Sequence, residues 1–286
     1  MAPPGAGELA GKVVLVTGAS RGIGAGIARR FAAEGGRVAI AARSLEPGSG
    51  GHLPGSLEEL AAEIRAAGGE AVSLAADLAD ATTPHAGLVA AVEQALGPID
   101  VLVNNAAACY YIPFEKVSDK RLRVAFEVNV FAPFQLTQTV IGAMAERGGC
   151  HVLNITSGIV DLPPGPPFTN AGANQRLATT YAVSKAALDR LTMALAMEYE
   201  GQVAVNALAP QAAVATEGAT AVMDLPEEWC EPMETMVEAS LALCTGPMTD
   251  TGRVAKSLSL LRERSRPVRS LDGRRDFDAT KWLEND

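Results

Sequence analysis

A glycine-rich turn between an apolar run and an amphipathic stretch is the feature that most restricts how this chain can fold. Residues 17–24 read TGASRGIG, and they follow the apolar run VVLV at residues 13–16. Beyond the turn, Ile23, Ile27 and Phe31 recur every four residues, which is the spacing of one helical face. The pattern therefore predicts a strand, a tight turn and a helix in succession.

The glycines of this turn give it a second property, the capacity to bind an anion. Gly18, Gly22 and Gly24 permit backbone conformations that other residues avoid, and they let a ligand approach the main chain. The first turn of the following helix offers free N–H donors and the positive end of a dipole, which suit a pyrophosphate. A tight turn without any ligand has the same pattern, so the motif alone leaves both interpretations open.

Apolar strand patterns alternate with helical patterns along most of the remaining chain. We expect further strands near residues 37–42, 71–75, 99–103, 151–155, 203–208 and 254–258. This alternation predicts an α/β fold, namely a single doubly wound Rossmann-type parallel sheet of about seven strands with helices on both faces. In such a sheet, ligands bind at the carboxyl ends of the strands.

The chain reads as one domain with short terminal extensions. We expect a flexible N-terminus at residues 1–10, a Rossmann domain at residues 11–261 and a C-terminal tail at residues 262–286. A substrate lid is predicted within the domain, near residues 211–238.

Three local signals refine the predicted helices. Ser56 and Glu59 form a capping box that starts one helix, and Thr83-Pro84 starts another with proline at its first position. A long helical region at residues 118–147 contains Pro133, where we expect a break.

Charge and composition exclude several classes of function. The chain has 24 Lys and Arg against 33 Asp and Glu, a net charge of −9, which argues against a nucleic-acid surface. It has no apolar run long enough to span a bilayer, so we expect no membrane partner and a soluble cytoplasmic protein. The four cysteines and three histidines have no metal-ligand spacing, and we predict free thiols and no metal site.

Tyr181 and Lys185 are candidate catalytic residues because they lie four apart on a predicted helix. An ammonium near a phenol favours the phenolate, and lowering the pKa of a tyrosine by about 3 units requires roughly 4 kcal/mol. Lys185 and an oxidised nicotinamide together are expected to supply it. Tyr181 then acts as a general acid or base on an alcohol or carbonyl oxygen. A tyrosine that merely packs beside a lysine is the structural alternative.

In this order along the chain, Gly18, Gly22 and Gly24, Asn104-Asn105-Ala106, Ser157, and Tyr181 with Lys185 resemble the short-chain dehydrogenase/reductase family. The resemblance covers about residues 11–216. The loop from Pro47 to Gly55, with the capped helix after it, resembles the hydroxysteroid dehydrogenase-like branch. Vertebrate members of that branch carry an extra sterol-carrier domain, for which we expect no room here.

The resemblance implies roles for individual residues. Ser157, at the end of the fifth predicted strand, binds the substrate oxygen, and Tyr181 exchanges a proton with that oxygen. Asn129 interrupts the long helix and holds a water against Lys185. Cofactor contacts fall on Gly18, Ser20, Arg21, Gly22, Ile23, Gly24, Arg43, Asp77, Leu78, Asn105, Ala106, Tyr181, Lys185, Pro210, Val214 and Thr216.

The sequence departs from the family pattern around the substrate. Ser157 and Tyr181 are 24 residues apart, which is longer than the usual interval, and the excess lies in a Pro/Gly-rich loop. Gln211 stands where the family has glycine, and Thr216 comes one residue late. The cofactor half of the site is therefore easier to predict than the substrate half.

The identity of the cofactor follows from charge. Sites that prefer NAD(H) place an acidic residue at the end of the second strand, about 20 residues beyond the glycines. Here that position is Ala42, and Arg43 follows it. Arg21 and Arg43 can clamp a 2′-phosphate, so NADP(H) is predicted over NAD(H).

The expected function is thus an NADP(H)-dependent oxidoreductase that interconverts a ketone and a secondary alcohol by hydride transfer. A catalytically silent NADP(H)-binding sensor or scaffold stays open, as does reduction of an enoyl double bond. Apolar residues in the predicted lid suggest an apolar small-molecule substrate, although plain packing also explains them. By resemblance we expect a homodimer or homotetramer.

Overall fold

The computed structural model describes residues 7–46, 53–80, 82, 85–168, 172–222 and 224–284. Within these residues, parallel strands form one seven-stranded sheet in the order β3-β2-β1-β4-β5-β6-β7. The strands are β1 (Val13–Thr17), β2 (Arg37–Ala42), β3 (Glu70–Ala75), β4 (Val101–Asn104), β5 (Cys150–Ile155), β6 (Val203–Ala209) and β7 (Val254–Lys256). The predicted fold class is confirmed. The last strand is shorter than expected, because a helix begins at Ser257.

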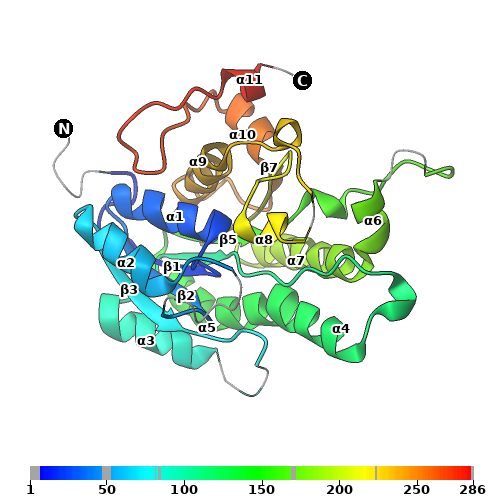
Figure 1. Ribbon diagram of the computed structural model, residues 1–286. Coiled ribbons are helices and arrows are strands. Elements are labelled where there is room, and N and C mark those ends of the chain that lie inside the picture. Colours follow the sequence, from blue (N-terminus) through cyan, green and yellow to red (C-terminus); the bar gives the residue numbers. More distant parts are fainter. Residues whose placement is uncertain are drawn as a thin grey trace.

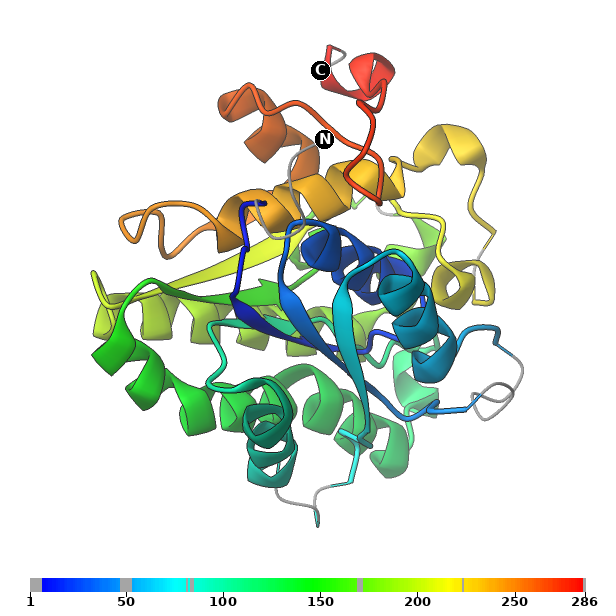
Figure 2. The ribbon, with the colours of Figure 1, turned by 90° about the vertical axis from the view of Figure 1, so that its left-hand side faces the viewer.

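Helices cover both faces of the sheet, as Figures 1 and 2 show. One face carries α1 (Gly22–Ala33), α2 (Leu57–Ala66), α9 (Met233–Cys244) and α10 (Ser257–Glu263). The other carries α3 (Ala86–Leu96), α5 (Ala132–Arg147) and α7 (Thr179–Glu198). Shorter helices are α4 (Asp119–Phe126), α6 (Ala173–Leu177), α8 (Glu217–Thr220) and α11 (Thr280–Leu283). The central strands are buried on both sides, which explains their nearly continuous apolar sequences.

One of the two predicted helix starts is observed, and the other lies outside the described residues. The Ser56 hydroxyl caps α2 by accepting from the backbone N–H of Glu59, as predicted. The predicted start at Thr83-Pro84 lies outside the described residues, and α3 begins at Ala86.

The predicted break or kink in the long helical region is present, and it lies in the turn directly before Pro133. A π-helical turn at Glu127–Phe131 separates α4 from α5. Pro133 lies in the first turn of α5 and has no N–H to donate to the carbonyl four residues earlier. The wider turn accommodates that missing donor and places Asn129 at its centre.

Both ends of the described chain pack against the domain. Leu9 is only 1% exposed and its N–H donates to Glu34 O, which contradicts a flexible segment as far as residue 10. The C-terminal tail folds back over α9 and α10, in orange and red in Figure 1, and buries Val268 and Ala279. The last residues of the predicted lid, 235–238, lie instead in a buried part of α9 that continues to residue 244 and belongs to the core.

The order of the strands fixes where a ligand can bind. The chain leaves β1 toward β2 on one side and later returns to β4 on the other, so β1 and β4 enclose the switch point of the sheet. The segments after β1, β4, β5 and β6 meet at this carboxyl edge. None of the helices in the described part combines the length and apolar character that crossing a bilayer requires.

Candidate active site

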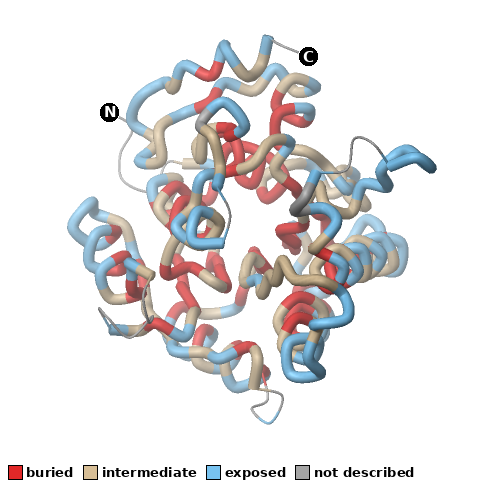
Figure 3. The backbone as a smooth tube through the Cα atoms, turned by 45° about the vertical axis from the view of Figure 1, so that its right-hand side comes forward, coloured by how far each residue is buried: buried red, intermediate tan, exposed pale blue. Residues whose placement is uncertain are grey.

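A cavity of about 730 Å³ opens at the carboxyl edge of the sheet. Figure 3 shows buried backbone, in red, at the centre of the molecule and exposed backbone, in pale blue, at its periphery. Ten of the predicted site residues line this cavity, namely Arg21, Gly22, Ile23, Asn105, Ser157, Tyr181, Lys185, Pro210, Val214 and Thr216. The other predicted site residues lie outside its lining, namely Gly18, Ser20, Gly24, Arg43, Asp77, Leu78, Ala106 and Asn129.

Two of the glycines outside the lining are required by close packing. Gly18 has a φ of +65°, and a Cβ there would lie 2.7 Å from the Cα of Ala106. A Cβ on Gly24 would lie 2.4 Å from Nδ2 of Asn105. The side chain of Asn105 donates to the carbonyls of Thr17 and Gly18, so it locks the turn to the end of β4. These residues shape the turn, and their contact with a cofactor stays a prediction.

The start of α1 already holds an anionic group. The backbone N–H of Gly22 donates to the Glu217 carboxylate over 3.1 Å. Glu217 lies in the first turn of α8, so this contact joins the predicted lid to the glycine turn. The carboxylate stands in for any negatively charged oxygen at this position, and it shows that the donors of the turn are accessible to one.

The two arginines predicted to bind a phosphate lie close in space. Nε of Arg21 donates to Pro54 O (2.8 Å), and its Nη2 contacts the Ser44 hydroxyl (3.4 Å). Ser44 directly follows Arg43, whose side chain is exposed. The guanidinium of Arg21 is therefore held at the end of β2, where the sequence places Arg43.

Asp77 and Leu78, the predicted cofactor contacts after β3, have mainly local roles in the structure. Asp77 is exposed, and its carboxylate accepts from the N–H of Ala79, which caps a turn. Leu78 is buried in the core beneath α3. Contact of either residue with a cofactor stays a prediction.

Ser157, Tyr181 and Lys185 come together at the end of β5, with Lys185 buried and the other two partly buried. Nζ of Lys185 donates to Ile155 O over 2.7 Å and lies 5.9 Å from the centre of the Tyr181 ring. Ser157 follows two residues after Ile155 and forms a hydrogen bond with the Tyr181 hydroxyl. Lys185 is 1% exposed. The strand end thus fixes all three side chains relative to one another.

Burial dominates the acid–base properties of this group. It lowers the pKa of Lys185 to about 8, against the opposing charge of Asp189. It also raises the pKa of Tyr181, an effect that the neighbouring Cys109 reinforces and the hydrogen bond with Ser157 opposes. The sequence predicted a lowered pKa for Tyr181 from Lys185 and an oxidised nicotinamide acting together. In the protein chain alone the pKa is raised, because loss of hydration outweighs the attraction of a lysine that is itself buried.

Asn129 braces the site from the π-helical turn. Its Nδ2 donates to Ala108 O (2.8 Å) and to the Ser184 hydroxyl (2.9 Å), and its Oδ1 accepts from the N–H of Ala108 (2.8 Å). It therefore ties the loop after β4 to the residue that precedes Lys185. Its predicted water-mediated contact with Lys185 stays a prediction.

Cys109 lies on the wall of the cavity near Tyr181. Burial raises the pKa of its thiol, despite a hydrogen bond with Tyr111 and the charge of Lys185. A thiol with a raised pKa is a poor nucleophile near neutrality, so Cys109 is suited to shaping the cavity.

Glu231 is a site residue that the sequence did not indicate. It is 2% exposed and accepts hydrogen bonds from the N–H groups of Gln211 (2.7 Å) and Ala212 (3.2 Å) and from the hydroxyls of Thr235 and Ser257 (2.7 Å each). This carboxylate fixes the loop after β6, where Gln211 replaces the family's glycine. Its partners lie as many as 26 residues away in sequence, so no local motif signals it.

Truncation of Glu231 is expected to destabilise the protein markedly. Glu231→Ala leaves two buried N–H groups and two hydroxyls without their acceptor, and we expect it to lower the free energy of unfolding by about 3 kcal/mol or more. Glu231→Gln keeps the volume and one acceptor oxygen, so its loss is expected to be smaller. Urea denaturation measures both, with Glu228→Ala, an exposed site nearby, as the control. Equal stability of Glu231→Ala and the control would contradict this role.

The glycine turn and the Ser–Tyr–Lys group, which line one cavity at the carboxyl edge of a parallel sheet, place the protein in the class of Rossmann-type folds. Comparison with known proteins agrees. The family described as short chain dehydrogenase matches residues 12–224. The chain belongs to this short-chain dehydrogenase family.

Individual relatives support both the family and the branch. Hydroxysteroid dehydrogenase-like protein 2 of Danio rerio is 31% identical over 277 residues, which cover 95% of this chain and 61% of the relative. This chain thus spans about three fifths of the relative's length. The predicted resemblance to the hydroxysteroid dehydrogenase-like branch is confirmed.

Solved structures extend the comparison to the fold and the cofactor. A short chain dehydrogenase from Mycobacterium thermoresistibile has a TM-score of 0.76 and 29% identity, covering 89% of this chain and 87% of that one. A 3-oxoacyl (acyl-carrier-protein) reductase from Agrobacterium tumefaciens, solved with NADP bound, has a TM-score of 0.71 and 30% identity, covering 87% and 93%. These similarities support the Rossmann-type fold and the family.

Proposed function

We propose that the protein is an NADP(H)-dependent oxidoreductase that interconverts a ketone and a secondary alcohol, with Tyr181 as general acid/base. The observation that carries this proposal is the Ser157–Tyr181–Lys185 group, which lines the same cavity as the anion-accepting start of α1. NADPH, when bound, supplies the hydride that reduces the carbonyl carbon.

The residues present fit such a cofactor. Arg21, Gly22 and Ile23 would hold the pyrophosphate at the start of α1, in place of the Glu217 carboxylate that Gly22 now binds. Arg21 and Arg43 would hold the 2′-phosphate. At the other end, Pro210, Val214 and Thr216 line the cavity near Tyr181 and would contact the nicotinamide.

Tyr181 supplies the proton when a ketone is reduced. Its raised pKa keeps the phenol protonated at neutral pH, so it donates a hydrogen bond to the carbonyl oxygen and gives up its proton as charge develops there. Ser157 holds the same oxygen. Lys185 is partly protonated near neutrality, because its pKa lies at about 8, and its ammonium stabilises the phenolate that remains.

The competing proposals are a silent sensor or scaffold that binds NADP(H) and an enoyl reductase. A sensor has no need to keep Ser157, Tyr181 and Lys185 together in the lining of this cavity. Enoyl reduction in related proteins uses a wider Tyr–Lys spacing than the four residues present here. Both observations favour ketone and alcohol chemistry.

We also propose a homodimer or homotetramer in the cytoplasm. Exposed apolar side chains lie along α5 and α7 and in the turn before α5, namely Phe131, Phe134, Met193 and Met197. Burial of such side chains between two copies would remove them from water. The proposal on assembly is independent of the proposal on chemistry.

A panel of ketones and aldehydes tests the proposed function. Purified protein with NADPH is expected to lose NADPH absorbance when a suitable ketone is added, and to regain it with the matching alcohol and NADP⁺. Tight binding of NADPH without turnover of any ketone or aldehyde would instead favour the sensor.

A further inference from the structure

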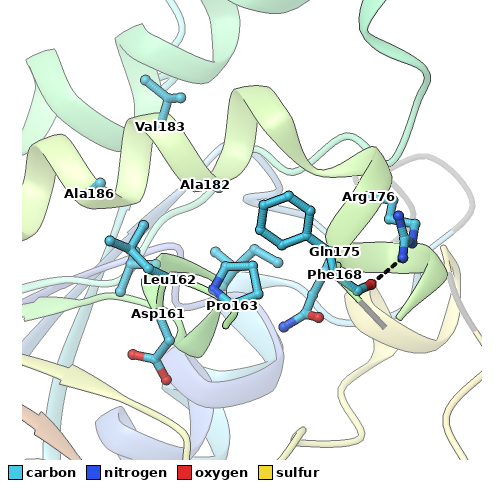
Figure 4. Close-up of a pocket in the computed structure, with 11 residues that line it drawn as sticks. Asp161, Leu162, Pro163, Phe168, Gln175, Arg176, Ala182, Val183 and Ala186 are labelled. Carbon is cyan, nitrogen blue, oxygen red and sulfur yellow. Dashed lines mark hydrogen bonds between the residues drawn. The ribbon is translucent and has the colours of Figure 1, made fainter. Parts of the chain in front are cut away.

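An apolar groove of about 410 Å³ lies beside the catalytic cavity, between α7 and the long loop after β5. Figure 4 shows Leu162, Pro163 and Phe168 of the loop beside Ala182 and Ala186 of α7, and Val183, also in the lining, pointing away from the loop. Eight of its eleven lining residues are apolar. Leu162 is 93% exposed and Val183 53%, so the groove presents a large apolar surface to solvent.

The groove is continuous with the catalytic cavity. Ile159, Asp161 and Gln175 line both of them. The N–H of Ile159 donates to the Ser157 hydroxyl over 3.3 Å, so the wall of the groove starts at the side chain that is proposed to hold the substrate oxygen. On the other wall, Ala182 directly follows Tyr181. The groove therefore adjoins the place where these two residues would hold a ketone oxygen.

The polar residues of the groove are bound to neighbouring groups of the protein. Asp161 pairs with Lys256, and Arg176 donates to Phe168 O, as Figure 4 shows for the second contact. Oε1 of Gln175 accepts from the N–H of Gly172. The surface that these contacts leave for a ligand is mainly hydrocarbon, which suits an apolar chain.

We infer that the groove binds an unbranched aliphatic tail of the substrate, whose ketone lies at Ser157 and Tyr181. The inference rests on the proposed function and names its substrate class as long-chain aliphatic ketones and secondary alcohols. The unusually long interval between Ser157 and Tyr181 supplies the outer wall of this groove.

A series of straight-chain 2-alkanones tests the inference. From 2-butanone to 2-undecanone, kcat/KM is expected to rise about fourfold for each methylene that enters the groove, which corresponds to about 0.8 kcal/mol per buried methylene. A kcat/KM that does not change with chain length would overturn the inference.

A variant that fills the groove with a larger side chain tests whether the groove causes the dependence on chain length. Ala186→Phe adds a ring to the exposed face of α7 that lines the groove and is expected to abolish the gain for the longer ketones, with 2-butanone unchanged. Val183→Asp makes the same wall charged and is expected to have the same effect. Glu198→Phe adds a ring at the exposed end of α7, away from the groove lining, and serves as the control. Identical chain-length dependence in Ala186→Phe and the control would contradict the inference.

Two further measurements separate the competing outcomes. Binding of 2-undecanone, followed by saturation-transfer NMR, is expected in the wild type and lost in Ala186→Phe, and this readout needs no turnover. Binding of 2-undecanone without reduction of any ketone would refute the proposed function and support the groove. If Val183→Asp instead lowers the mass of the protein in solution and leaves the chain-length dependence unchanged, the groove is an interface between copies and the inference is wrong.

Discussion

Tyr181→Phe is expected to lower kcat for ketone reduction by about 10²–10⁴-fold, the usual contribution of a positioned general acid. The variant removes only the hydroxyl, which shares a hydrogen bond with Ser157 at the end of β5. The ring, and with it the packing near Lys185, stays in place. NADPH affinity is therefore expected to change little, because the glycine turn and Arg21 are untouched. Steady-state assays that follow NADPH absorbance give kcat, and quenching of protein fluorescence gives the Kd for NADPH.

Tyr111→Phe is the matched control for this experiment. Tyr111 also lines the cavity, and its hydroxyl bonds to Cys109. Burial raises the pKa of Tyr111 as well, so a raised pKa alone does not mark a proton donor. Removal of this hydroxyl is expected to cost far less activity, since Ser157 and Lys185 are not joined to it. Comparable losses in the two variants, or activity retained in Tyr181→Phe, would refute the role given to Tyr181.

The sheet was predictable because its signals are local. Each strand is a short apolar run bounded by turn residues, and each following helix has an apolar stripe, so the order of elements and the carboxyl edge follow directly. The π-helical turn at Glu127–Phe131 was not predictable in this way. A single widened turn adds only one residue to a helical pattern. Pro133 indicates a break or kink in the helix, but it does not indicate that the break takes the form of a π-helical turn.

Acid–base properties were harder to predict than residue identity. The spacing of Tyr181 and Lys185 placed both on one face of α7, which the structure shows. The direction of the pKa of Tyr181 depends instead on how many neighbouring atoms exclude water, and no sequence pattern reports that quantity. Glu231 eluded prediction for a related reason, since its partners come from three separate segments.

The substrate half of the site remains the part that the sequence determines least. The interval between Ser157 and Tyr181 could be counted, but whether its extra residues cover the catalytic cavity or build a second surface depends on how the loop packs. In the structure, this loop and α7 enclose an apolar groove joined to the cavity.

Arg43→Asp is expected to reverse the cofactor preference. In the wild type, kcat/KM should be higher with NADPH than with NADH, because Arg21 and Arg43 are expected to bind the 2′-phosphate and position 42 holds alanine instead of an acidic residue. Loss of charge-assisted hydrogen bonds costs about 1.5–3 kcal/mol, and the new carboxylate adds repulsion, so kcat/KM with NADPH is expected to fall about 10²–10³-fold. The value with NADH should stay near that of the wild type.

The control for this variant separates a local contact from a change in net charge. Lys120→Asp makes the same change of two charges at the exposed start of α4, and it is expected to leave the ratio of NADPH to NADH unchanged. A wild type that prefers NADH would refute the predicted cofactor outright. Equal losses with both cofactors in Arg43→Asp would show that Arg43 acts on the shared pyrophosphate half or on the fold, since only a contact with the 2′-phosphate distinguishes the two cofactors. The ratio of kcat/KM with NADPH to kcat/KM with NADH therefore tests whether the glycine turn and the end of β2 form one binding surface. Arg21 joins the two segments.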